Sequence, residues 1–417
     1  MAKEITLDFE LNKTNLPVSD QTQIAYLLID AKSSTARFSG EARLNLSLVM
    51  DRSASMKGEK IENVKKAMEN IIDRLDADDY LSIVTFNEEA DVLIPTQPVS
   101  DKAALKEKVN ELTYSGGTAI SSGMSEGLNE LRNSLTEDRI NRMIVLTDGQ
   151  TYGDEDQCFE LAEEAEDDGI VITALGVGDE WHEDVLDTIA ARNDGKSDYI
   201  ETPDDIIPIF DEEMQSFKNI VTENNKLTLR LANGVTPKKI CRVIPYISEL
   251  EYESFSENEV RVDIGELDQT QGLSVLAELK ITPRQQGRFR IAQAELTYDV
   301  PAENIYGEKT RADIITHFSA NGAESKKINP RVMNTVEKVS AYDLQTRALT
   351  QAVSGDISGA TQKLRAAATR LLDMGEDDLA NAAMEEAENL EKMGSMSSSG
   401  TKKLRYETRK LTRRLVA

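Results

Sequence analysis

The sequence predicts a doubly wound α/β domain inserted in or beside an antiparallel β-sandwich, followed by an α-helical region. Apolar runs alternate with helix-spaced apolar residues through 42–220, a pattern typical of parallel strands joined by helices. The segments 1–41 and 221–325 show the two-residue period of half-buried strands, and the spacing becomes helical in 326–417. These four segments are the expected domains of the chain.

The strand-like segments on either side of the α/β domain are expected to form one sandwich. Ile5, Leu7 and Phe9 alternate with polar residues, and 23–30 is a second strand candidate. Long alternating stretches return at 227–231, 260–264, 273–281 and 289–298. We expect the strands of 1–41 to join those of 221–325, because the entry and exit of an inserted α/β domain lie close together.

A strand over 44–50 is the centre of the predicted α/β domain. Its apolar residues suit a strand that is buried on both faces, and apolar residues spaced as in a helix follow from Ile61 to Leu75. Asp51, Ser53 and Ser55 come directly after the strand. In open parallel α/β sheets, ligands bind at the carboxyl ends of the strands, so these three oxygen donors lie where a ligand is expected.

Two further segments bring oxygen donors to the same edge of the sheet. The sequence SGGT at 115–118 ends with Thr118 and comes directly before a helical stretch. A second buried strand at 142–146 is followed by Thr147 and Asp148. With Asp51, Ser53 and Ser55, the residues Thr118 and Asp148 complete a set of two carboxylates and three hydroxyls. Such a donor set suits a hard cation, Mg²⁺ first, with Mn²⁺ or Ca²⁺ as alternatives.

In this order, the three segments resemble a von Willebrand factor A (VWA) domain with a complete metal-ion-dependent adhesion site (MIDAS), of the bacterial cytosolic type. The resemblance covers about 42–218 and implies a Rossmann-like fold. It implies that Ser53 and Ser55 are direct ligands and that Thr118 binds directly or through water. Asp51 and Asp148 would bind the metal directly or through water.

The donor set predicts a function in protein–protein interaction rather than catalysis. Two carboxylates and three neutral hydroxyls leave the cation with uncompensated charge and an open position, which an Asp or Glu of a partner protein can fill. No catalytic residue is expected. One alternative is a phosphatase of the haloacid-dehalogenase type, but Ser53 stands where that chemistry needs an acidic residue. The other alternative is a purely structural metal site.

Composition limits the partners and the compartment. The net charge of −27 and pI near 4.6 argue against general nucleic-acid binding, because like charges repel phosphate. Only Cys158 and Cys241 are present, which favours a reducing compartment. No stretch of 18 apolar residues is found, and the amino terminus lacks the features of a secretory signal. We expect a cytoplasmic protein with no transmembrane segment.

The helical region ends in a basic segment. The spacing predicts a helical hairpin from 360–372 and 379–390, and MGSMSSSG at 393–400 is expected to be a flexible connector. The tail 401–417 carries seven Lys or Arg residues against one Glu, with Leu404, Leu411 and Leu415 on one helical face. We expect this helix to dock on the protein's own acidic body or on a partner.

Overall fold

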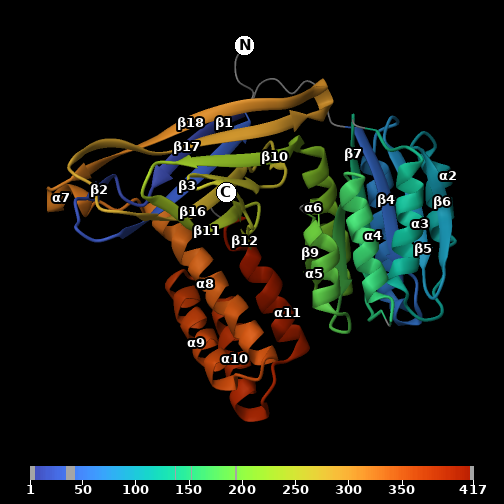
Figure 1. The fold of residues 1–417 in the computed structure, drawn as a ribbon. Coiled ribbons are helices and arrows are strands. Elements are labelled where there is room, and N and C mark those ends of the chain that lie inside the picture. The colour runs from blue at the N-terminus through green and yellow to red at the C-terminus, as the bar shows by residue number, and fades with distance from the viewer. Residues whose placement is uncertain (1–4, 34–42, 137, 152, 193–194, 414–417) are drawn as a thin grey trace. The chain divides into compact units, whose positions relative to one another are not determined.

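A computed structural model describes residues 5–33, 43–136, 138–151, 153–192 and 195–413, and it has two compact units (Figure 1). The first unit consists of Met1–Ser39, Val221–Val300 and Asn304–Ala417, and the second of Gly40–Ile220 with Pro301–Glu303. The second unit is thus inserted into the chain of the first. The predicted fold class, an α/β domain inserted in or beside an antiparallel β-sandwich with a helical region, is confirmed.

The sheet of the second unit has six strands, in the order β6-β5-β4-β7-β8-β9. They are β4 (Arg43–Asp51), β5 (Tyr80–Phe86), β6 (Ala90–Pro98), β7 (Arg139–Thr147), β8 (Val171–Val177) and β9 (Lys196–Ile200). All neighbours are parallel except β6, which forms an antiparallel edge hairpin with β5. The chain passes from β5 on one side of β4 to β7 on the other. The strand order therefore reverses beside β4, and ligands bind at such switch points.

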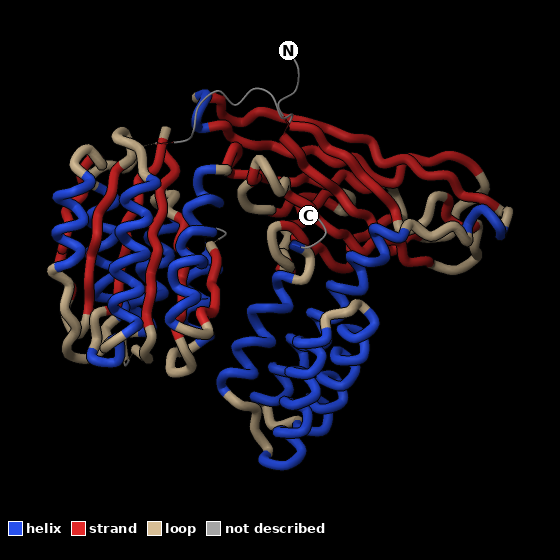
Figure 2. Tube along the Cα trace, turned by 180° about the vertical axis from the view of Figure 1, so that it is seen from behind, coloured by secondary structure: helices blue, strands red, loops and turns tan. Residues whose placement is uncertain are grey.

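Helices cover both faces of this sheet (Figures 1 and 2). The first face carries α1 (Glu59–Arg74), α2 (Lys102–Asn110) and α6 (Ile206–Lys218), and the second carries α3 (Ile120–Arg132), α4 (Glu155–Asp167) and α5 (Glu183–Ala191). Short 3-10 turns precede two helices, η1 (Ala54–Met56) before α1 and η3 (Pro203–Asp205) before α6. Because both faces are covered, β4 needs apolar side chains in both directions: Leu48 packs in the core of α1 and α6, and Val49 faces α3.

The first unit contains two packed sheets. One has the order β1-β3-β16-β11-β12 and the other β13-β14-β10-β17-β18-β2, with β15 paired to β10. Their bounds are β1 (Ile5–Leu11), β2 (Asn15–Pro17), β3 (Gln23–Ser33), β10 (Ile220–Leu231), β11 (Val235–Ile244), β12 (Ser248–Glu249), β13 (Glu253–Ser256), β14 (Glu259–Asp263), β15 (Leu267–Asp268), β16 (Leu273–Ile281), β17 (Gly287–Val300) and β18 (Ile305–Ser319). A shared core fills the space between the sheets. The amino-terminal strands β1 and β3 lie in the first sheet, where β3 pairs with β16.

A helical region packs on the outer face of the first sheet. It contains α8 (Pro330–Val353), α9 (Ile357–Asp373), α10 (Asp377–Met393), α11 (Ser398–Glu407) and η5 (Thr408–Lys410). Two short helical elements that precede this region in the chain are η4 (Pro301–Glu303) and α7 (Gly322–Ser325). Its core includes Leu28, Val243 and Leu276 of the sheet. In the described residues, no helix is long and apolar enough to cross a membrane.

The prediction of a flexible connector over 393–400 is wrong. Gly394, in the left-handed conformation, ends α10, and the Ser397 side chain accepts a hydrogen bond from the backbone N–H of Gly400 at the start of α11. The backbone N–H of Ser397 donates to Glu386 at 2.7 Å. Serine residues are common in flexible linkers, but here the same side-chain chemistry caps a helix.

The basic tail packs within the first unit as far as Arg413. Leu404, Tyr406 and Leu411 are buried. The Lys338 side chain donates a hydrogen bond to the carbonyl of Leu411 at 2.7 Å, and the backbone N–H of Ile247 donates to the carbonyl of Arg409 at 2.8 Å. These contacts are apolar or involve backbone carbonyls. Leu415 lies outside the described residues.

Candidate metal site

The candidate site lies where β4 and β7 end, next to the reversal of strand order. Asp51 is the last residue of β4, and Asp148 follows the last residue of β7. Backbone hydrogen bonds join the loop after β4 to the loop before α3: the N–H of Ser115 donates to the carbonyl of Arg52, and the N–H of Ala54 donates to the carbonyl of Gly116. These bonds hold two of the three predicted segments together, and the pairing of β4 with β7 brings the third beside them.

A chain of side-chain contacts connects four of the five predicted residues. The Asp51 carboxylate accepts a hydrogen bond from the backbone N–H of Ser53 at 2.7 Å. The hydroxyls of Ser53 and Ser55 are 2.9 Å apart, and the Ser55 hydroxyl donates to Asp148 Oδ1 at 2.7 Å. Residues separated by almost 100 positions in the sequence thus converge on one point.

Thr118, the fifth residue, and Ser55 both lie close to Gly149. A Cβ atom at Gly149 would lie 3.1 Å from Thr118 Oγ1 and 3.9 Å from Ser55 Oγ. The loop carrying Thr118 is fixed by Glu88, whose carboxylate accepts a hydrogen bond from the backbone N–H of Gly117 at 2.6 Å. The structure therefore brings all five predicted side chains into one cluster.

The cluster is buried at Asp51, Asp148 and Ser53, and it reaches solvent at Ser55 and Thr118. Asp51, Ser53 and Asp148 are at most 1% exposed. Thr118 is half-buried and Ser55 is exposed. These five oxygen-bearing side chains would hold a cation, and Ser55 and Thr118 are the ones that an outside ligand could reach.

Burial makes the Asp51 carboxylate unfavourable as a free anion. Loss of solvent raises the pKa of Asp51 to about 6, although hydrogen bonds from Thr147 and Ser53 oppose the shift; the negative charge of Asp148 raises it further. Thr147 Oγ1 donates to Asp51 Oδ2 at 2.6 Å. Two neighbouring buried acids gain from a cation, and oxygen donors suit a hard one. The residues present therefore fit a divalent metal such as Mg²⁺.

Two contacts at the site were not predicted from the sequence. The Lys60 ammonium lies 2.5 Å from Asp148 Oδ2 as an ion pair, and the Thr147 hydroxyl holds Asp51. Thr147 could have been found, because it ends the same strand that delivers Asp148. Lys60 gives no such signal, because lysine in the first turn of a helix is usually a solvated surface residue.

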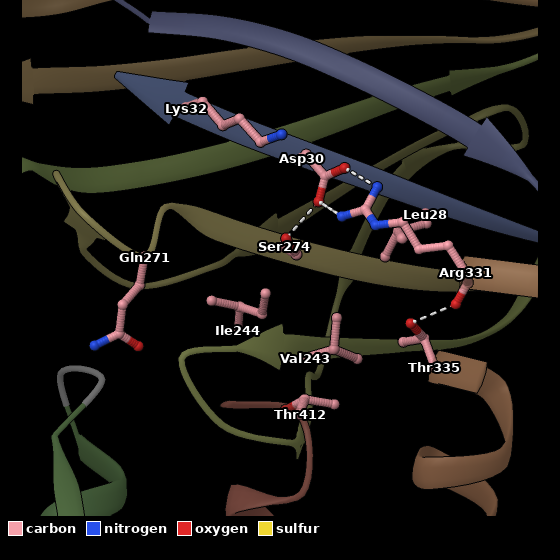
Figure 3. A pocket seen from close by; sticks show the side chains of 10 residues that line it. All are labelled: Leu28, Asp30, Lys32, Val243, Ile244, Gln271, Ser274, Arg331, Thr335 and Thr412. Carbon is pink, nitrogen blue, oxygen red and sulfur yellow. Dashed lines mark hydrogen bonds and ion pairs between the residues drawn. The ribbon is translucent and has the colours of Figure 1, made fainter. Parts of the chain in front are cut away.

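A separate cavity of about 270 Å³ lies in the first unit, among β3, β11, β16 and the start of α8 (Figure 3). Leu28, Val243 and Ile244 form its apolar wall. Arg331 lines it too, but its guanidinium is already bonded to the carboxylates of Asp30 and Glu10. Arg331 and its two carboxylate partners thus satisfy one another, which is typical of a structural ion pair.

Comparison with known proteins places the chain in a family. The model for the von Willebrand factor type A domain matches residues 45–211, and the model described as "Sll0103-like, C-terminal alpha-helical domain" matches residues 330–414. The uncharacterized protein Sll0103 of Synechocystis sp. is 31% identical over 371 residues, which cover 87% of each chain. The chain belongs to the Sll0103-like family of VWA proteins.

More distant matches show how far this likeness extends. The uncharacterized protein YfbK of Escherichia coli is 23% identical to this chain over 243 residues. The match covers 57% of this chain and 42% of YfbK. The solved structure of a von Willebrand factor type A protein from Catenulispora acidiphila has a TM-score of 0.77 at 18% identity, over 97% of this chain and 96% of that one. At this identity the likeness shows the fold alone, but it covers the sandwich and the helical region as well as the VWA domain.

Proposed function

We propose that this Sll0103-like protein is a non-enzymatic interaction module in which a bound Mg²⁺ captures an Asp or Glu carboxylate of a partner protein. Asp51, Ser53, Ser55, Thr118 and Asp148 would hold the ion. The observation that supports the proposal best is the difference in burial across these residues: Asp51, Asp148 and Ser53 are buried, whereas Ser55 is exposed and Thr118 half-buried. The accessible hydroxyls leave a route by which a partner carboxylate could reach a bound cation.

The choice of Mg²⁺ follows from the donors. All five side chains offer oxygen, and hydroxyls together with carboxylates suit Mg²⁺ or Mn²⁺, while Ca²⁺ uses the same atoms at longer distances. Since only two of the donors carry charge, the bound ion retains affinity for a further anion. A carboxylate on a partner supplies that anion directly.

Phosphatase activity is the rival proposal and has less support. A haloacid-dehalogenase-type phosphatase needs a carboxylic acid two positions after its nucleophilic aspartate, and Ser53 occupies that position after Asp51. A serine hydroxyl is a poor general acid near neutral pH. The test is an assay of the full chain with Mg²⁺ and a generic phosphomonoester, for which we expect no turnover above that of Asp51→Asn.

A purely structural metal is the second rival. Capture from a native extract separates the two roles, with the full chain as bait in Mg²⁺ and then in chelator. We expect acid-bearing partners to be released by chelator and to be absent with Asp148→Asn as bait. If the ion only holds the loops together, chelator will lower the melting temperature and leave the captured proteins unchanged.

We also propose a cytoplasmic location, because both cysteines are free thiols. Cys158 and Cys241 are both buried free thiols in different units. Burial raises the pKa of Cys241 to about 12, so this thiol stays protonated and unreactive at neutral pH. Free thiols of this kind are typical of proteins in reducing compartments.

A further inference from the structure

We infer that Lys60 is an internal cation that competes with the metal ion for Asp148 and so sets the metal concentration at which the site fills. The inference rests on the proposed metal site and concerns its regulation. It assigns a role to a residue that is outside the five predicted ligands.

The first step is the geometry at Asp148. The Lys60 ammonium lies 2.5 Å from Asp148 Oδ2, while Oδ1 accepts the Ser55 hydroxyl at 2.7 Å. Both carboxylate oxygens are therefore engaged. The Asp148 side chain is fully buried, so solvent does not compete for either oxygen.

The second step is the freedom of the lysine side chain. Lys60 is the second residue of α1, and its neighbours Ile61 and Val64 are buried in the core, so the backbone at this position is fixed. The side chain is 27% exposed. A flexible chain of four methylene groups can move its ammonium into water without disturbing α1.

The third step is the charge at the site. Asp51 and Asp148 together carry two negative charges, and the Lys60 ammonium neutralises one of them. A divalent cation at Asp148 would meet an ammonium of like charge, and the two repel at such short range. Metal binding therefore has to break or weaken the Lys60–Asp148 pair, which lowers the apparent affinity for metal.

The opposite role for Lys60 predicts the opposite sign. A residue that only oriented Asp148 for the metal would leave the carboxylate poorly placed when removed, and affinity would fall. Competition predicts that affinity rises. The sign of the change in metal affinity thus separates the two roles.

The experiment compares Lys60→Met with Lys57→Met in the full chain. Both variants lose one positive charge from neighbouring positions, but Lys57 is exposed and lies before α1. Mn²⁺ binding to chelator-treated protein is followed by electron paramagnetic resonance of the free ion. We expect Lys60→Met to bind Mn²⁺ about fivefold more tightly, the factor for a partly exposed ion pair, and Lys57→Met to stay within about twofold of wild type.

Thermal melting supplies a second readout. Without metal, Lys60→Met is expected to melt below wild type, because its buried acids lose their counter-charge, and the difference should vanish at saturating Mn²⁺. Lys60→Arg keeps the positive charge and is expected to bind Mn²⁺ as wild type does. It also provides the test if Lys60→Met does not fold, because tighter Mn²⁺ binding by Lys60→Arg would overturn the inference.

The outcomes also separate this inference from the proposed function. Unchanged or weaker Mn²⁺ binding by Lys60→Met, with normal binding by wild type, overturns only the role of Lys60. If wild type does not bind Mn²⁺ at millimolar concentration, the metal site and the inference both fail.

Discussion

Arg331 and Asp30 are 301 positions apart in the sequence, yet the guanidinium of Arg331 donates hydrogen bonds to both oxygens of the Asp30 carboxylate, at 2.7 and 2.9 Å. Arg331 lies in the first turn of α8 and Asp30 in β3. The Ser274 hydroxyl donates to the same carboxylate at 2.5 Å (Figure 3). This pair fastens the start of the helical region to an amino-terminal strand of the sandwich.

Arg331→Met should destabilise the first unit. The side chain of Asp30 is only 3% exposed and would lose the charge that compensates it. Breaking a buried ion pair costs about 3–5 kcal/mol, and since Arg331 is 40% exposed and partly screened by solvent we expect a smaller loss, about 2–3 kcal/mol. Urea unfolding followed by circular dichroism measures the loss. The double variant Asp30→Asn with Arg331→Met should recover part of it, and an equally unstable double variant would count against the uncompensated charge as the cause.

Asp148→Asn should abolish the stabilisation of the protein by Mg²⁺. An ion that binds only the folded state adds about 2.7 kcal/mol at 100 times its dissociation constant, so the melting temperature of wild type should rise with Mg²⁺ and fall again with chelator. The matched control is Asp156→Asn, an exposed acid in the first turn of α4. It should respond to Mg²⁺ as wild type does. Retention of the Mg²⁺ response by Asp148→Asn would remove this residue from the ligand set.

Gly127→Ala should destabilise the second unit through the contact of α3 with β4. A Cβ atom at this position would lie 2.6 Å from Val49 Cγ2 and 3.0 Å from Met143 Cε, in a space where two elements already touch. Overpacking costs about 1–3 kcal/mol, and the better helix propensity of alanine returns less than 1 kcal/mol. Gly322→Ala in α7 is the control, because its Cβ would meet no atom within 4 Å. Equal unfolding midpoints for the two variants would contradict the tight packing.

The five clustered residues could be found in the sequence because topology alone brings them together. An apolar run ending in Asp51 marks a buried strand, and parallel strands deliver their carboxyl ends to one edge of the sheet. Asp148 follows the neighbouring strand for the same reason. Neither step needs the direction of an individual side chain.

Lys60 and the Arg331–Asp30 pair could not be found in this way. Both depend on where a long side chain points, and helical or strand periodicity does not specify that. Asp30 ends an apolar stretch in the sequence and gives no sign that a residue 301 positions later neutralises it. The prediction of a flexible connector over 393–400 was wrong for a related reason. The Ser397 side chain caps α11 and its backbone N–H donates a hydrogen bond to Glu386, and neither contact can be read from the sequence.

Gln345→Leu should stabilise the helical region. Gln345 lies in α8 and is 1% exposed, and neither its amide nitrogen nor its amide oxygen has a hydrogen-bond partner within the described part of the chain. A buried polar group without a partner costs about 1–3 kcal/mol, whereas leucine of similar size packs among the apolar residues of this core. We expect a gain of about 1 kcal/mol in the free energy of unfolding. Gln345→Ala is the control for lost volume and should destabilise by leaving a cavity. A loss of stability in Gln345→Leu comparable to that in Gln345→Ala would mean that the amide is satisfied in solution, for instance by an internal water.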